Sequence, residues 1–117
     1  MAGLWVWTRV AEPYAVVTVG GELDVASAGS LRAHLTKVLR RLGPRLALDL
    51  GELSFIDSSG LSVLIGCWKL AHGMGGTLCV VAPPDLLRRK LRITGLDRRL
   101  EVFPDLRAVL RAAGAEG

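Results

Sequence analysis

The sequence predicts an α/β domain in which a mixed sheet of about five strands carries helices mainly on one face. Short apolar runs rich in valine and leucine alternate with longer segments whose apolar residues recur every three or four positions. Strands separated by helices pair in parallel through right-handed crossovers, whereas strands joined by a short turn pair antiparallel. The 117 residues fit one compact domain over positions 1–117.

The first predicted unit is a β-hairpin. The segments 4–8 and 14–19 are rich in β-branched and aromatic residues, and Glu12-Pro13 between them marks a turn. Gly20 and Gly21 are expected to end the second strand. Trp5 and Trp7 lie on the same face of the first strand, where they serve either the core or a dimer contact.

A helix is predicted after the hairpin, with Asp24 or Ser27 able to cap its N-terminus. Gly43 and Pro44 close it, as a C-cap glycine followed by proline does. The apolar stripe expected to face the core consists of Leu31, Leu35, Val38, Leu39 and Leu42.

The middle of the chain predicts a central strand and a second helix. Residues 45–50 have apolar side chains on both faces, as in a strand covered by helices. The helix follows Asp57-Ser58-Ser59-Gly60 and ends at the glycines of positions 73–76. Its apolar residues recur with a period near 3.6, at Leu61, Leu64, Ile65, Trp68 and Ala71.

The last third of the chain predicts two further strands and two helices. Residues 77–82 are a fully apolar strand, and Pro83-Pro84 opens a third helix. The expected buried residues of that helix are Leu86, Leu87, Leu91 and Ile93, and its terminator is Gly95. Residues 100–103 predict a short strand. Pro104 begins a final helix, whose tail from about Ala112 is expected to fray.

Composition and spacing exclude several classes of protein. No basic segment precedes an apolar run at the N-terminus, and no apolar run reaches the ~18 residues needed to span a bilayer, so we expect a cytoplasmic protein without a membrane partner. Cys67 and Cys79 have no companion at CxxC or metal-ligand spacing, which predicts free, buried thiols and no metal site.

Catalytic and nucleotide motifs are absent as well. A hydrolase elbow has the pattern GxSxG, whereas positions 56–60 have Ile-Asp-Ser-Ser-Gly, and His34 and His72 are both interpreted as helix residues. Neither GxGxxG nor GxxxxGK[ST] occurs. No aromatic residue interleaves with the basic run at positions 88–92. The sequence therefore predicts no enzyme, no cofactor and no direct nucleic-acid partner.

Asp57-Ser58-Ser59-Gly60 is the candidate functional segment. It places two hydroxyls at the start of a helix, where unpaired backbone N–H groups and the macrodipole favour a negative group. Gly21-Glu22-Leu23-Asp24 also follows a strand and precedes a helix, so both loops are expected at one edge of the sheet. The residues leave two interpretations open: helix caps, or a site for a phosphoserine or a bound phosphate.

Three segments resemble the anti-sigma-factor antagonists of the SpoIIAA type, which are small bacterial STAS-domain proteins. These segments are residues 21–24 (Gly-Glu-Leu-Asp), residues 48–61 around Asp57-Ser58-Ser59-Gly60, and residues 93–96 (Ile-Thr-Gly-Leu). The resemblance covers nearly the whole chain and implies a STAS-like single domain. At Ser62 the chain departs from the family, which often has a second glycine there.

The resemblance implies a partner switch. In the family, the unphosphorylated antagonist binds an anti-sigma factor that is also a serine kinase, and so releases the sigma factor. The kinase phosphorylates the first serine after the motif's aspartate, which corresponds to Ser58, with Ser59 as a rival acceptor; a PP2C-type phosphatase reverses the modification. The expected partner-binding residues are Glu22, Asp24, Asp57, Ser58, Ser59 and Gly60.

Other functions stay open at this point. One is a STAS module that binds a nucleotide or anion at the same helix N-terminus. Another is a component of a larger signalling complex that lacks its own phosphoswitch. A third is weak nucleic-acid binding through Arg88, Arg89 and Lys90, which steep salt dependence would reveal.

Overall fold

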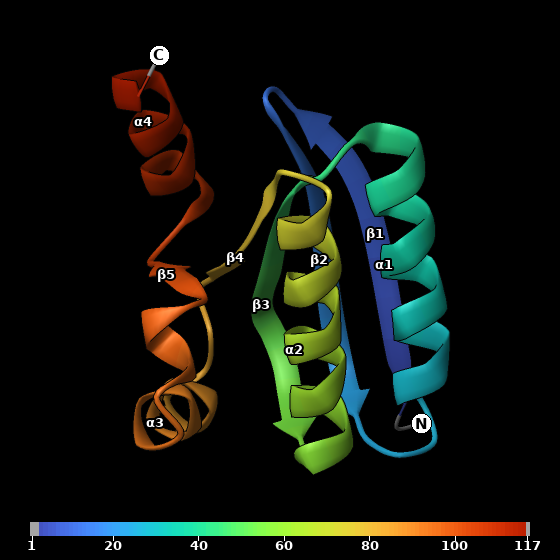
Figure 1. Cartoon of the computed structure of the whole chain (residues 1–117). Helices are drawn as coiled ribbons and strands as arrows, with labels where there is room; N and C mark the ends of the chain where they lie inside the picture. The colour runs from blue at the N-terminus through green and yellow to red at the C-terminus, as the bar shows by residue number, and fades with distance from the viewer. Residues whose placement is uncertain (1–2, 117) are drawn as a thin grey trace.

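The computed structural model describes residues 3–116 and shows a five-stranded mixed sheet with the strand order β1-β2-β3-β4-β5 (Figure 1). The strands are β1 (Leu4–Ala11), β2 (Tyr14–Leu23), β3 (Arg45–Ile56), β4 (Thr77–Val81) and β5 (Glu101–Phe103). The helices are α1 (Ala28–Leu42), α2 (Ser58–Gly73), α3 (Asp85–Ile93) and α4 (Leu106–Glu116), with a 3-10 turn, η1 (Leu96–Arg98). β1 pairs antiparallel with β2 and the other pairings are parallel, which confirms the predicted fold class.

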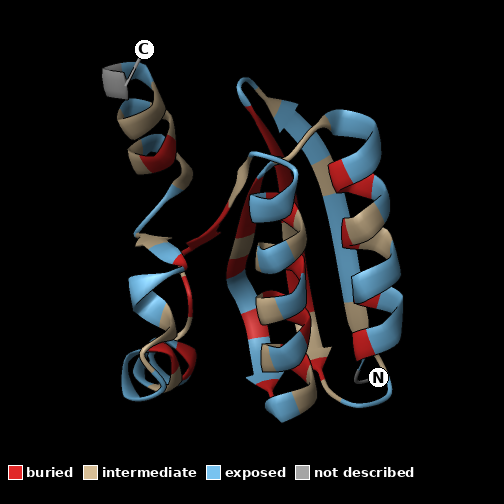
Figure 2. Ribbon diagram, viewed as in Figure 1, coloured by how far each residue is buried: buried red, intermediate tan, exposed pale blue. Residues whose placement is uncertain are grey.

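The main hydrophobic core lies between the sheet and α1, α2 and α3. In Figure 2, the buried residues of the central strands lie behind α1 and α2. A smaller cluster on the opposite face is covered by Val109 and its neighbours in α4, which pack against Tyr14, Val16 and Cys79. Three helices therefore cover one face and α4 covers part of the other, as predicted.

The two central strands are longer than predicted. β2 does not end at Gly20 and Gly21 but continues to Leu23, with register shifts against β3 on either side of these glycines. A Cβ at Gly20 would overlap the ring of Trp5, and Gly21 has a φ of +87°. Both positions therefore require glycine, and the strand continues through them as an irregular segment rather than ending there. β3 continues past Leu50 to Ile56 because it pairs with this extended β2.

Several predicted core positions are wrong. The exposed fractions of three predicted core side chains are 50% for Leu42, 55% for Leu86 and 76% for Ile93. Each of these residues lies at or beside the end of its helix, where the side chain is not covered by the sheet. In α2, Leu64 and Ala71 are buried as predicted, and two residues outside the predicted stripe, Val63 and Cys67, are buried as well. α4 extends from Leu106 to Glu116.

Both cysteines are free and buried, as predicted. Burial raises the pKa of Cys67 to about 11 and the pKa of Cys79 to about 12, so both thiols are neutral at pH 7. Trp5 and Trp7 are 47% and 68% exposed and are not core residues. Among the described residues, no helix has the length and apolarity that crossing a bilayer requires.

Candidate functional site

The C-terminal ends of β2 and β3 lie side by side at the edge of the sheet where α2 begins (Figure 1). Leu23 is in register with Ile56, and the backbone N–H of Asp57 donates to the carbonyl of Leu23 at 3.2 Å. The hydroxyl of Ser54 donates to the carbonyl of Gly21 at 3.0 Å. The two candidate loops are thus held together, which confirms their predicted placement at one edge.

Asp57 caps α2. Its backbone is extended, with φ −113° and ψ −170°, and its Oδ1 accepts hydrogen bonds from the backbone N–H groups of Ser59 at 2.9 Å and Gly60 at 3.2 Å. An N-cap carboxylate satisfies donors that the first turn of a helix cannot pair internally. The capping role that the sequence allows to a serine therefore belongs to the aspartate.

Ser58 is the first residue of α2, and its side chain is exposed. Within the described part of the chain its hydroxyl has no hydrogen-bond partner, while its carbonyl accepts a bond from the Ser62 hydroxyl at 3.0 Å. Ser59 is half-buried, and its backbone N–H is held by Asp57. Of the two serines, Ser58 presents the more accessible hydroxyl.

Gly60 is buried and sets how closely α2 approaches the sheet. A Cβ at this position would lie 2.6 Å from Cγ1 of Ile56 and 2.8 Å from Cγ of Leu23. Both neighbours belong to the main core. Only glycine allows the first turn of α2 to pack directly on the ends of β2 and β3.

The loop between β2 and α1 forms its own hydrogen-bond network. Oδ1 of Asp24 accepts from the N–H groups of Ala26 at 3.0 Å and Ser27 at 3.2 Å. The Ser27 hydroxyl accepts from the N–H of Asp24 and donates to the carbonyl of Glu22, both at 3.0 Å. Ser27 occupies the N-cap position of α1, as predicted, but neither its side chain nor that of Asp24 accepts a bond from an N–H inside the helix. The two side chains stabilise the loop instead.

Lys90 brings a positive charge from α3 to this edge. Its Nζ donates to the carbonyl of Ile56 at 3.2 Å, beside the capping residue Asp57. The sequence places Lys90 in the basic run at positions 88–92 and does not predict this contact. The two residues are 34 positions apart, and no local pattern signals the approach.

The histidines do not form a catalytic pair with either serine. His34 lies 2.7 Å from the Thr8 hydroxyl, between α1 and β1. His72 stacks on Trp68 in the last turn of α2, at the far end of the helix from Ser58. Among the described residues, no group of three His, Cys, Asp or Glu side chains is arranged to hold a metal ion. The site is therefore suited to binding and modification rather than to nucleophilic catalysis.

Removing the cap separates the role of Asp57 from that of Ser58. We expect Asp57→Ala to lower the free energy of unfolding by about 1 kcal/mol, because the N–H groups of Ser59 and Gly60 lose their acceptor. Ser58→Ala, whose hydroxyl has no internal partner, should change it by less than about 0.5 kcal/mol. Urea denaturation of the two variants measures both values. An equal loss in Ser58→Ala would mean that the serine carries the cap.

Comparison with known proteins agrees with this architecture. The model of the STAS domain family matches residues 7–109. The chain is 35% identical over 86 residues to the anti-sigma-B factor antagonist of Bacillus subtilis, covering 74% of this chain and 78% of that protein. It is 34% identical over 91 residues to the anti-sigma F factor antagonist of Paenibacillus polymyxa, covering 75% and 76% respectively.

Solved structures give the same result. The crystal structure of an anti-sigma factor antagonist from Mycobacterium paratuberculosis superposes with a TM-score of 0.84 at 29% identity, covering 94% of this chain and 93% of that one. The phosphorylated form of the Bacillus cell fate determinant SpoIIAA superposes with a TM-score of 0.73 over 94% of this chain and 99% of that one. At 21% identity, this second similarity is evidence for the fold alone.

Proposed function

The chain belongs to the STAS-domain family of anti-sigma factor antagonists, and we propose that it binds an anti-sigma factor and so releases a sigma factor. Members of this family are not enzymes, in line with the absence of catalytic motifs from the sequence. We further propose that the anti-sigma partner is a serine kinase and that phosphorylation of Ser58 switches binding off.

The observation that carries the proposal is the free hydroxyl of Ser58 beside a completed cap. Because Asp57 already satisfies the N–H groups of Ser59 and Gly60, the Ser58 hydroxyl is available for transfer of a phosphoryl group. The exposure of Ser58 gives a kinase access to it. A phosphoserine carries about −1.5 to −2 charges at pH 7, and no buried contact of Ser58 has to break to admit it.

The proposed contact surface consists of the two loops at this edge. Glu22, Asp24 and Asp57 are half-buried and acidic, so a phosphate on Ser58 adds charge of the same sign to a surface that the partner must desolvate. Ser59 belongs to the same surface. Gly60 contributes by fixing the position of the helix rather than by touching the partner. A PP2C-type phosphatase would restore the binding form, and both reactions would take place in the cytoplasm.

Phosphorylation mapping tests the proposal. The purified protein is incubated with its cognate anti-sigma kinase and ATP, and its peptides are then sequenced by mass spectrometry. We expect a single phosphate on Ser58, retained in Ser59→Ala and lost in Ser58→Ala. Phosphate on Ser59 alone would move the switch by one residue. If the kinase bound the protein but left it unmodified, the proposed phosphoswitch would be refuted. The antagonist function would not be refuted by that result.

A nucleotide-binding role is less well supported. The hollow beside the end of β3, between Phe55 and Leu86, has a volume of about 30 Å³. That volume admits about one water molecule, whereas sites for small organic ligands occupy several hundred Å³. The hollow beside the end of β3 is therefore too small to hold a nucleotide.

A further inference from the structure

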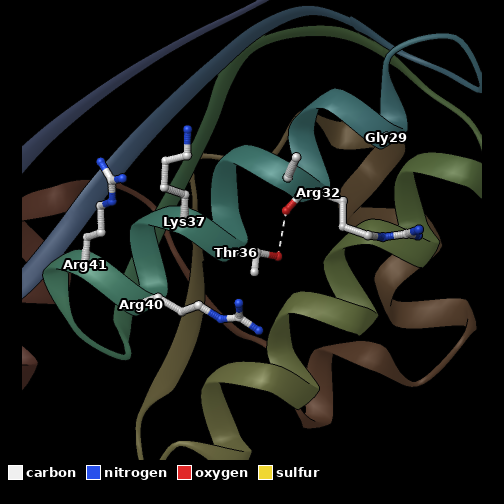
Figure 3. A pocket seen from close by; sticks show the side chains of 7 residues that line it. Gly29, Arg32, Thr36, Lys37, Arg40 and Arg41 are labelled. Atoms are coloured by element: carbon white, nitrogen blue, oxygen red, sulfur yellow. Dashed lines mark hydrogen bonds between the residues drawn. The ribbon is translucent and has the colours of Figure 1, made fainter.

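We propose that the outward face of α1 is a second docking surface, which binds an acidic helical segment of a protein partner. This basic face consists of Arg32, Lys37, Arg40 and Arg41 around a floor of Gly29, Ala33 and Thr36. The side chains enclose an open hollow of about 620 Å³ (Figure 3). The surface contains none of the residues of the phosphoacceptor loop, so the inference goes beyond the proposed function.

The charges of this face are uncompensated. The sequence of α1 contains no acidic residue, and all four cations are exposed. Over the described residues, none of them forms an ion pair with a carboxylate. Arg40 and Arg41 lie in the last turn, where cations complement the helix macrodipole, but that effect does not extend to Arg32 or Lys37. Four like charges along one short helix repel one another, and an acidic partner would relieve that repulsion.

The shape of the face fits another helix. Gly29, Ala33 and Thr36 are spaced four and three residues apart, so they form one row along α1, in which Gly29 and Ala33 are exposed and Thr36 is half-buried. In Figure 3, Arg32 and Arg40 extend to the side of α2, and Lys37 and Arg41 extend to the opposite side. The Thr36 hydroxyl donates to the carbonyl of Arg32 at 2.8 Å and is thereby drawn down against the helix. A row of small residues allows a second helix to approach to about 8 Å, between two flanks of cations.

The lining of the hollow favours a protein segment over nucleic acid or a membrane. Its floor of Gly29, Ala33 and Thr36 is mainly apolar and suits the small side chains of a helix. No Phe, Tyr or Trp residue lies in α1, so bases find none of these large rings on which to stack. The lining contains no large apolar side chain that would insert into a bilayer.

The expected partner segment follows from these dimensions. α1 has 15 residues and is about 22 Å long, which matches about four turns of a second helix. Alanine or a similar small residue would face the floor, and glutamate or aspartate would meet the arginines in charge-assisted, bidentate hydrogen bonds. A contact of this size is smaller than a standard protein interface, so binding is expected to be weak and reversible.

The test uses the full-length protein and a fluorescent 15-residue helical peptide of glutamate and alanine, at low ionic strength. We expect Arg32→Gln combined with Arg40→Gln to weaken binding about tenfold or more. The matched control is Arg88→Gln combined with Arg89→Gln in α3. Both of those arginines are exposed, and the pair removes the same charge from another helix, so it should change binding less than about twofold.

Ala33→Trp distinguishes a shaped site from mere attraction between charges. It fills the floor without altering any charge, and we expect it to weaken peptide binding about tenfold while the thermal midpoint stays close to that of the unmodified protein. Equal losses in the two arginine pairs, or full binding by Ala33→Trp, would overturn the proposal. So would tighter binding of duplex DNA, or of vesicles rich in phosphatidylserine, through Arg32 and Arg40.

Discussion

Replacing Ser58 by aspartate is expected to weaken binding to the proposed anti-sigma factor about a hundredfold, which corresponds to about 3 kcal/mol. The physical reason is where the new charge would lie. Asp57 already accepts hydrogen bonds from the N–H groups of Ser59 and Gly60. When the partner removes water from a carboxylate at position 58, these two donors cannot take the place of that water. It remains directed outward, toward the partner, next to Asp57 itself.

The neighbouring charges increase this effect. Glu22 near the end of β2 and Asp24 in the following loop lie at the same edge of the sheet, where Lys90 contacts the carbonyl of Ile56. The ammonium of Lys90 already donates to a backbone carbonyl. Its single charge does not neutralise the carboxylates of Glu22, Asp24 and Asp57 together with an added aspartate. Because phosphate carries more charge than aspartate, phosphorylated protein should bind more weakly than Ser58→Asp.

Calorimetric titration of each variant with the anti-sigma factor measures this difference. Ser58→Ala should bind like the unmodified protein, since the hydroxyl has no internal partner. Ser59→Asp is the matched control for position: it adds the same charge one residue later, at a half-buried site, so comparing the two affinities separates the effect of the charge from the effect of its place. Thermal unfolding shows whether each variant remains folded. Full binding by a folded Ser58→Asp variant would exclude electrostatic switching at this residue.

Much of the site follows from the sequence because topology and local spacing determine it. Two strands that pair in parallel must present their C-terminal ends at one edge, so Asp24 and Asp57 could be placed together before any coordinates were known. The 3.6-residue period likewise identifies Leu64 and Ala71 as core residues of α2. Both inferences depend on backbone geometry that is the same in every sequence, namely the direction of paired strands and the 3.6-residue turn of a helix.

What the sequence leaves undetermined depends on contacts between distant residues. Asp57, Ser58 and Ser59 are all good capping residues, and only the extended backbone at Asp57 decides which one caps. Gly20 and Gly21 have the composition of a strand end, yet Trp5 and the pairing with β3 keep them within the sheet. The contact of Lys90 with Ile56 requires the full arrangement of α3 against β3.

Gly60→Ala is expected to destabilise the protein by about 1–3 kcal/mol, the usual cost of overpacking a filled core. The added Cβ would lie 2.6 Å from Cγ1 of Ile56 and 2.8 Å from Cγ of Leu23. These atoms are close to the backbone of buried side chains, so they cannot move aside cheaply. The first turn of α2 must shift instead, and the shift would disturb the hydrogen bonds that Asp57 accepts from the N–H groups of Ser59 and Gly60.

Gly66 provides the matched control within the same helix. A Cβ there meets nothing within 4 Å, and the position is exposed, so Gly66→Ala should stabilise the protein by about 0.5–1 kcal/mol through helix propensity. Urea denaturation should therefore give opposite signs for one substitution at two sites six residues apart. If both variants were stabilised, the ends of β2 and β3 would have room for a methyl group, and Gly60 would not fix the position of the phosphoacceptor turn. Opposite signs would instead mean that the glycine holding Ser58 in place is also required by the core beneath it.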